Sequence, residues 1–260
     1  MNNQNRNFDN IRDLLRLVRV EDYGTFVQLI IGYLLAGGRD GWYLMSSLAI
    51  LAPCVYGGLY ALNDVHDAIA DRQHPLKCTR PIAAGRIDSR SGFLIGVSLI
   101  SVGIVTALVF DFKILVLTLL FVGINLAYTF KFKSVPYLEI ALNTITHPLR
   151  FAAGLWLAGI WVHWPLLITW TLATFAITTL KRVKEMRESS SAVRPVLHYY
   201  NEANLMYLIT FSLVLLIGVL PFTTGACFIL TGIWFTLTLV TVVGYFSIPT
   251  IKQLEEHLWR

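Results

Sequence analysis

Residues 92–130 read GFLIGVSLISVGIVTALVFDFKILVLTLLFVGINLAYTF, which is two apolar runs separated by a short polar connection at Asp111. The runs are Gly92–Phe110 and Lys113–Phe130. A helix of about 20 residues crosses the roughly 30 Å hydrocarbon core of a bilayer. Strands of a membrane barrel alternate apolar and polar residues instead, so continuous runs of this length exclude a barrel. The stretch therefore predicts two consecutive transmembrane helices.

The same pattern recurs along the whole chain. Six further apolar runs are Tyr23–Gly37, Trp42–Leu62, Pro136–Ile160, Trp164–Leu180, Ala203–Leu220 and Ala226–Phe246. Only 14% of the 260 residues are charged, against about 25% in soluble domains, and the mean hydropathy is +0.61. The sequence thus predicts an all-α integral membrane protein, a bundle of eight transmembrane helices forming one domain over residues 1–260. The run Tyr23–Gly37 is short for a span.

The basic residues predict the orientation in the membrane. In the eight-span arrangement, 18 Lys and Arg residues fall on the side of the termini and the loops Asn63–Ser91 and Lys181–Glu202, and 2 fall on the opposite side. The positive-inside rule places the richer side in the cytoplasm. We expect a multi-pass protein of the cell membrane with both termini and both loops cytoplasmic. The formal net charge is +5, and the basic residues cluster between the apolar runs. This placement favours contact with a membrane surface, and we expect no binding to nucleic acid. With no apolar segment in the first twenty residues, the first span is expected to direct insertion.

An acidic motif directly continues the second run. Residues 63–85 read NDVHDAIADRQHPLKCTRPIAAG, and Asp64, Asp67 and Asp71 are spaced i, i+3, i+7. Such residues share one face of a helix, and three carboxylates on one face repel each other unless a cation lies between them. Mg²⁺ prefers carboxylate oxygens together with substrate phosphates, and Asn63 adds a neutral oxygen. We therefore predict an Mg²⁺ site at Asn63, Asp64, Asp67 and Asp71; the alternative is a solvated helix end.

Basic residues follow the acidic motif in the same loop. Lys77, Arg80 and Arg86 suit the oxygens of a phosphate or diphosphate, and attraction to anionic lipid is the alternative. Pro81 and Gly85 predict a fixed turn there.

The motif Asn63-Asp64-x-x-Asp67-x-x-x-Asp71 resembles the first aspartate-rich motif of the UbiA superfamily of intramembrane prenyltransferases, and its place after the second span matches too. The resemblance implies a helical bundle open to lipid. It also implies Mg²⁺ as cofactor, an activated diphosphate donor and a lipophilic acceptor. Family members usually have nine spans, so nine is the alternative to eight.

The second loop departs from the usual family pattern. Where members carry a second aspartate-rich motif, this chain has Lys181-Arg182-x-x-Glu185, whose spacing allows one helix face. This pattern, with His74-Pro75-x-Lys77-x-x-Arg80-Pro81, resembles the polyprenyl-phosphate phosphoribosyltransferase branch, apart from Cys78, which replaces a basic residue common there. The resemblance implies that Arg182 binds donor phosphate and that Lys181 and Glu185 act in catalysis. The alternative is a solvated, positive helix end.

Polar residues inside the runs extend the candidate site. Arg150 lies inside an apolar run and therefore needs a charged partner or a polar cavity. It would either form a structural ion pair or contact the donor phosphate or the acceptor. Glu139 lies three turns away and need not be that partner. Tyr128 is a second candidate for the donor site, or an interfacial residue. Gly57-Gly58 and Ala152-Ala153-Gly154 predict close helix packing.

Three functions remain at this point. The favoured one is phosphoribosyl transfer from phosphoribosyl diphosphate to a polyprenyl phosphate. The second is transfer of an isoprenoid from its diphosphate to an aromatic or lipid acceptor, or cyclisation of the isoprenoid. The third is a small transporter, which would place charges at mid-depth in the spans. The charges gather at one face instead, which favours an enzyme.

Overall fold

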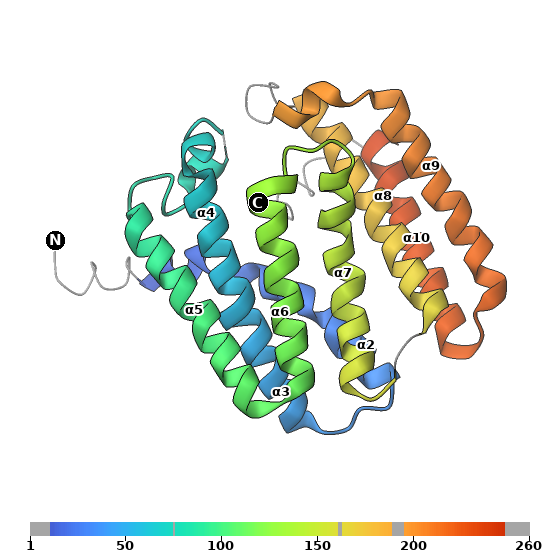
Figure 1. Ribbon diagram of the computed structural model, residues 1–260. Coiled ribbons are helices and arrows are strands. Elements are labelled where there is room, and N and C mark those ends of the chain that lie inside the picture. Colours follow the sequence, from blue (N-terminus) through green and yellow to red (C-terminus); the bar gives the residue numbers. More distant parts are fainter. Residues whose placement is uncertain (1–10, 75, 161–162, 189–194, 248–260) are drawn as a thin grey trace. The chain divides into compact units, whose positions relative to one another are not determined.

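The computed structural model describes residues 11–74, 76–160, 163–188 and 195–247, and all the regular elements of this part are helices (Figure 1). The contacts between residues divide the chain into two compact units. Unit 1 is Met1–Phe132 with Ala153–Gly159, and unit 2 is Lys133–Ala152 with Ile160–Arg260.

Unit 1 contains the longer series of elements. They are η1 (Val20–Phe26), α2 (Val27–Leu35), α3 (Gly41–Ala49), η2 (Ile50–Tyr56), α4 (Gly57–Arg72), η3 (Lys77–Thr79), α5 (Ser89–Phe110), α6 (Phe112–Ala127) and η4 (Tyr128–Phe132). The segments η2 and η4 are π-helical. Unit 2 contains most of α7 (Leu138–Leu157), then α8 (Trp164–Glu188), η5 (Pro195–Tyr199), α9 (Glu202–Val219), η6 (Leu220–Phe222) and α10 (Gly225–Ser247).

Six helices in the described part of the chain are long and apolar enough to cross a membrane. They are Gly41–Arg72, Ser89–Phe110, Phe112–Phe132, Trp164–Arg187, Glu202–Phe222 and Gly225–Phe246. The prediction of an all-helical, multi-pass membrane protein is thereby confirmed. The two remaining predicted runs form α2, which has 9 residues, and α7, which has 20 residues and carries Glu139, Pro148 and Arg150. The count of eight spans remains a prediction.

The polar connection between the runs Gly92–Phe110 and Lys113–Phe130 is a helix cap. The Asp111 side chain accepts hydrogen bonds from the backbone N–H groups of Lys113 (2.7 Å) and Ile114 (3.2 Å) and thereby starts α6. A capping carboxylate satisfies donors that the first helical turn leaves without a partner. One aspartate is thus enough to end α5 and begin the antiparallel return.

Small residues bring helices of unit 1 into close contact, as predicted. A Cβ on Gly58 of α4 would lie 2.7 Å from the carbonyl oxygen of Gly96 in α5, and one on Gly96 would lie 2.9 Å from that of Gly58. A Cβ on Gly154 would lie 2.1 Å from the carbonyl oxygen of Leu29 in α2. Since only glycine permits this approach, α4 is fixed against α5 along the part that precedes its acidic motif.

Helices α7 to α10 enclose the core of unit 2. Ile140, Leu180 and Val183 are buried with Leu205 and Ile209 in one apolar cluster, which packs around the cytoplasmic end predicted for α8. Further along α7, Phe151 stacks on Trp170 of α8 with ring centroids 4.4 Å apart. This packing holds α7 against α8 on both sides of the charged residues described below.

Candidate active site

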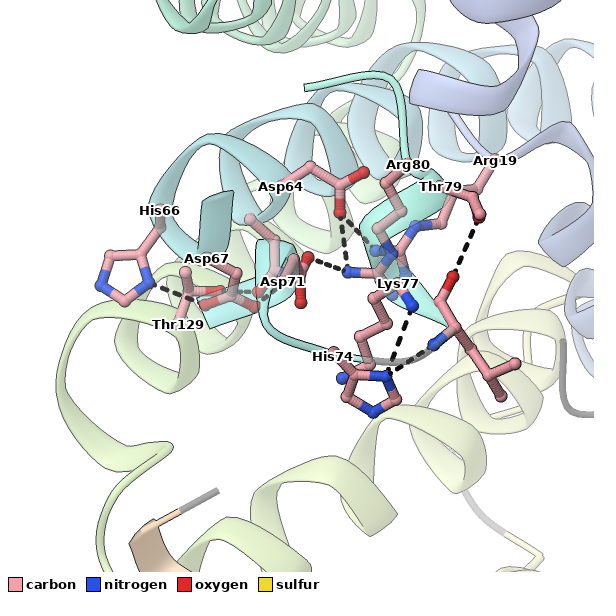
Figure 2. Close-up of polar contacts among 12 residues, drawn as sticks. Arg19, Asp64, His66, Asp67, Asp71, His74, Lys77, Thr79, Arg80 and Thr129 are labelled. Atoms are coloured by element: carbon pink, nitrogen blue, oxygen red, sulfur yellow. Dashed lines mark hydrogen bonds and ion pairs between the residues drawn. The ribbon is translucent and has the colours of Figure 1, made fainter. Parts of the chain in front are cut away.

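The acidic motif lies in the last part of α4, in unit 1 (Figure 2). Asn63, Asp64, Asp67 and Asp71 are all within this helix, as predicted. Asp64 and Asp71 are 2% and 4% exposed, whereas Asp67 is half-buried. Burying an ionised carboxylate is costly unless a charge compensates it. The motif is therefore no solvated helix end.

Two arginines compensate the buried carboxylates. Arg19 Nη2 donates to Asp64 Oδ1 at 2.5 Å. Arg80 Nη1 donates to the same oxygen at 3.2 Å and to Asp71 Oδ2 at 2.6 Å. Figure 2 shows the two guanidinium groups side by side at the carboxylates. Arg80 therefore bridges Asp64 and Asp71, with a single nitrogen between two carboxylate oxygens.

Arg19 is a site residue that the sequence analysis missed. It precedes η1 with φ 52°, a left-handed conformation that is uncommon for a residue other than glycine. Its guanidinium carbon lies 4.8 Å from the centre of the Tyr60 ring, in a cation–π contact. Burial lowers the pKa of Arg19, but the charge and hydrogen bond of Asp64, together with Tyr60 and Asp22, leave this pKa above its ordinary value. Because 45 residues separate Arg19 from Asp64, no local spacing signals the pair.

Asp67 has a different set of partners. Asn63 Nδ2 donates to Asp67 Oδ2 at 3.1 Å, and His66 Nδ1 lies 3.0 Å from Asp67 Oδ1. Asn63 Oδ1 accepts from Thr129 Oγ1 at 3.4 Å, which links α4 to the π-helical segment η4. Tyr128, a predicted donor-site residue, begins η4 and is half-buried.

The donor set suits Mg²⁺ in chemistry. Asp64 Oδ2 is buried and has no hydrogen-bond partner in the described residues, whereas Oδ1 has two arginines. A buried carboxylate oxygen without a donor is rare and is the kind of ligand that Mg²⁺ prefers. The three carboxylates nevertheless do not converge: within the described ranges, no three Asp, Glu, His or Cys side chains gather closely enough to hold one metal ion. Arg80 lies where Asp64 and Asp71 come together.

The loop after α4 has the predicted fixed turn. Gly85 has φ +72°, and Arg86 N donates to Pro81 O at 2.9 Å. The Arg86 side chain donates to both oxygens of Asp13 at 2.9 Å, so it pairs outside the acidic motif. Lys77 begins η3 and is half-buried, and its backbone N–H points to His74 Nδ1 at 3.4 Å (Figure 2). The turn thereby fixes the backbone that carries Arg80.

Unit 2 has a charged cluster of its own. Arg182 of α8 donates from Nε and Nη2 to the two oxygens of Glu139 in α7, at 2.5 and 2.8 Å. Arg182 Nη1 donates to Glu185 at 2.9 Å, which confirms that these two residues share a helix face. Glu139 and Arg182 are 0% and 1% exposed. Arg182 is therefore a buried structural cation, and its predicted contact with donor phosphate remains a prediction.

Tyr200 completes this cluster and was not identified from the sequence. Its hydroxyl donates to Glu139 Oε1 at 3.0 Å and accepts from Tyr137 N at 3.2 Å. Burial and the neighbouring Glu139 raise the pKa of Tyr200, so the hydroxyl stays protonated near neutral pH. Tyr137 has φ 61°, and its ring packs edge-on against Tyr200 at 5.2 Å. The contact holds the start of α7 in a left-handed backbone conformation.

Two other predicted residues also lie in unit 2. Lys181 is exposed in α8, next to Arg182. Arg150 is buried in α7 at 3% exposure. The carboxylate of Glu139 binds Arg182 and Tyr200.

The UbiA prenyltransferase family profile matches residues 25–256, nearly the whole chain. The chain belongs to this family. In fold, it is similar to a UbiA homolog from Archaeoglobus fulgidus, solved with GPP and Mg²⁺. The TM-score is 0.75 at 17% identity, over 88% of this chain and 85% of the other. The sequence-based resemblance to the superfamily is thus confirmed.

The curated sequence relatives are longer than this chain. An uncharacterised protein of Sinorhizobium fredii is 29% identical over 186 residues, 70% of this chain and 36% of the relative. The decaprenyl-phosphate phosphoribosyltransferase of Mycobacterium tuberculosis is 28% identical over 193 residues, 70% of this chain and 61% of the relative. The chain thus matches about a third to three-fifths of the length of these curated relatives.

Proposed function

We propose that this protein is an Mg²⁺-dependent intramembrane transferase that cleaves an activated diphosphate donor. Its favoured reaction is phosphoribosyl transfer from phosphoribosyl diphosphate to a polyprenyl phosphate. One observation carries the proposal: two buried carboxylates lie beside two arginines, and Asp64 Oδ2 has no partner in the described part of the chain. The relative from Mycobacterium tuberculosis, a decaprenyl-phosphate phosphoribosyltransferase, supports the choice of donor and acceptor.

The residues of α4 would hold the metal ion. Asp64, Asp67 and Asp71 would supply charged oxygens, with Asn63 assisting. When bound, Mg²⁺ neutralises charge that develops on the departing diphosphate. Lys77 and Arg80 in the following loop would bind the same phosphate oxygens through charged hydrogen bonds. The fixed turn holds the backbone that carries both residues beside the acidic motif.

The residues of α8 would serve the ribose-phosphate part of the donor. Glu185, held by Arg182, could accept a hydrogen bond from a sugar hydroxyl. Lys181, exposed next to it, would bind a phosphate, with Arg150 and Tyr128 as further candidates for phosphate contact. A donor with an additional 5-phosphate requires more positive charge than an isoprenoid diphosphate does, which favours the ribosyl donor.

The second candidate is prenyl transfer, or cyclisation of the isoprenoid itself. It is favoured by the structural neighbour from Archaeoglobus fulgidus, which was solved with GPP. The acidic motif would act in the same way with either donor. The two candidates would differ only in the residues that contact the transferred group, a phosphoribosyl or an isoprenoid group.

A donor screen with the purified protein tests the proposal. Phosphoribosyl diphosphate is compared with geranylgeranyl and shorter isoprenoid diphosphates, and diphosphate release is followed with and without Mg²⁺. We expect release from phosphoribosyl diphosphate that requires Mg²⁺ and a polyprenyl phosphate. Release from isoprenoid diphosphates alone would favour the second candidate, and substrate flux across proteoliposomes without any release would indicate a transporter.

We predict that Lys181→Ala and Glu185→Ala each reduce turnover of phosphoribosyl diphosphate by about one to two decades. A hydrogen bond to a charged group contributes roughly 1.5–3 kcal/mol, which corresponds to that factor. Lys184→Ala, on the same helix, is the matched control and should retain turnover. Equal losses for all three variants would show that turnover depends on the charged end of α8 as a whole, and that neither Lys181 nor Glu185 makes a specific contact with the donor.

A further inference from the structure

The guanidinium of Arg80 lies in the place that a bridging cation would take. Its Nη1 atom contacts Asp64 Oδ1 and Asp71 Oδ2 at 3.2 and 2.6 Å, so two carboxylate oxygens that lie about two turns apart on α4 share one positive group (Figure 2). Both carboxylates are buried, with side chains that are 1% and 5% exposed. Two buried carboxylates require a compensating cation while both are ionised. An exchange of one cation for another keeps their charge compensated.

The two arginines differ in how firmly they are held. Arg19 is fixed by its bond to Asp64 and by the Tyr60 ring. Arg80 follows the short helix η3 in the loop, and its side chain is 23% exposed, against 17% for that of Arg19. We expect Arg19 to stay on Asp64 Oδ1, and Arg80 to be the group that can move.

We propose that Arg80 is the resident counter-ion of Asp64 and Asp71, and that a divalent cation replaces it there and releases its guanidinium to the diphosphate. The inference rests on the proposed function and deepens it, because it assigns Arg80 two successive partners. Asp64 Oδ2, which has no partner among the described residues, supplies a further oxygen for the incoming ion. Metal and diphosphate then bind cooperatively, since the first ligand frees a binding group for the second, and linkage makes this coupling reciprocal.

Metal binding without turnover tests the exchange. The free Mn²⁺ signal in electron paramagnetic resonance gives the Kd of the purified protein for Mn²⁺, alone and with inorganic diphosphate. We expect Arg80→Gln to bind Mn²⁺ alone about tenfold more tightly than the unmodified protein, because the competing charged hydrogen bonds are gone. We also expect inorganic diphosphate to tighten Mn²⁺ binding less in this variant. Arg90→Gln is the matched control, because Arg90 is an exposed arginine at the start of α5, and its Mn²⁺ affinity should be unchanged.

The opposite results are equally clear. A folded Arg80→Gln variant with unchanged or weaker Mn²⁺ affinity would show that Arg80 is a permanent part of the cluster, and would overturn the proposal. If this variant does not fold, Arg80→Lys replaces it. Lysine keeps the positive charge, but its shorter side chain reaches the two oxygens less well, so Mn²⁺ should again bind more tightly. Unchanged affinity in Arg80→Lys would likewise contradict the exchange. Neither readout depends on the donor, so a failed donor screen would leave the result standing.

Discussion

At the scale of single residues, Asp64 has two distinct oxygens. Oδ1 receives both arginines, and Oδ2 is buried without a partner in the part of the chain that the structure describes. A carboxylate that is satisfied on one side only is held in orientation while it can still bind a ligand. The asymmetry distinguishes Asp64 from Asp67, both of whose oxygens have neighbours on α4.

We predict that Asp64→Asn lowers Mg²⁺-dependent turnover by about 100-fold, since it removes a charged ligand that contributes roughly 3 kcal/mol. The shape of the side chain is kept, so the protein should remain folded, as its thermal midpoint in detergent would show. Asp13→Asn is the control, because Asp13 pairs with Arg86 away from the motif. Near-normal turnover of Asp64→Asn would rule out the metal-site assignment.

At the scale of elements, pairs of helices are positioned by backbone contact in unit 1 and by buried charge in unit 2. Gly58 and Gly96 let α4 and α5 approach until a Cβ would collide with the opposite backbone. In unit 2, Glu139 and Arg182 connect α7 to α8 through two hydrogen bonds. The glycine contact precedes the acidic motif in α4, and the ion pair includes Arg182, which is next to Lys181 in α8.

We expect Gly58→Ala to destabilise the protein by about 1–3 kcal/mol, because the added Cβ would lie 2.7 Å from a backbone oxygen. Gly123→Ala in α6 is the matched control. Nothing lies within 4 Å of its Cβ position, and alanine favours a helix, so stability should hold or rise. Unfolding curves in mild detergent would compare the two variants. Equal midpoints would contradict the close approach of α4 and α5.

Glu139→Gln should cost about 3–5 kcal/mol of stability, because it removes the buried carboxylate that binds Arg182 and leaves this arginine with Glu185, whose side chain is 23% exposed. Glu202→Gln provides the comparison. Its ion pair with Arg187 has side chains that are 42–44% exposed, and an exposed pair contributes about 0–1 kcal/mol. Thermal unfolding monitored by tryptophan fluorescence would measure both. A small loss for Glu139→Gln would mean that Arg182 finds another partner.

At the scale of the whole molecule, the sidedness of the loops remains a prediction from the basic residues, and a native cysteine can test it. Cys78 lies in the loop after α4, and the other two cysteines are Cys54 and Cys227. In a Cys54→Ala, Cys227→Ala variant, we expect an impermeant maleimide added to intact cells to leave Cys78 unlabelled, and permeabilised cells to be labelled.

Adding Arg39→Cys to the same background is the positive control. Arg39 is exposed and lies on the side predicted to face outward. Efficient labelling of Cys78 from outside intact cells would reverse the topology. It would also place the acidic motif on the outer face of the membrane.

The sequence by itself determined the class of fold and the acidic motif. Apolar runs such as Gly92–Phe110 have to face lipid or a core whatever their neighbours are, and the spacing of Asp64, Asp67 and Asp71 is fixed by the 3.6-residue turn of one helix. The contact of Arg182 with Glu185 followed from the same local rule.

Only the tertiary structure decided the partners of the charged groups. Arg19 is 45 residues from Asp64, and Arg182 is 43 residues from Glu139, so no spacing within a helix brings them together. Arg182 lies in a buried ion pair with Glu139, a partner that the sequence does not indicate, and its contact with donor phosphate stays a prediction. Contacts within one helix follow from the spacing of its residues. Contacts that compensate buried charges between segments depend on which segments the packing of apolar faces brings together.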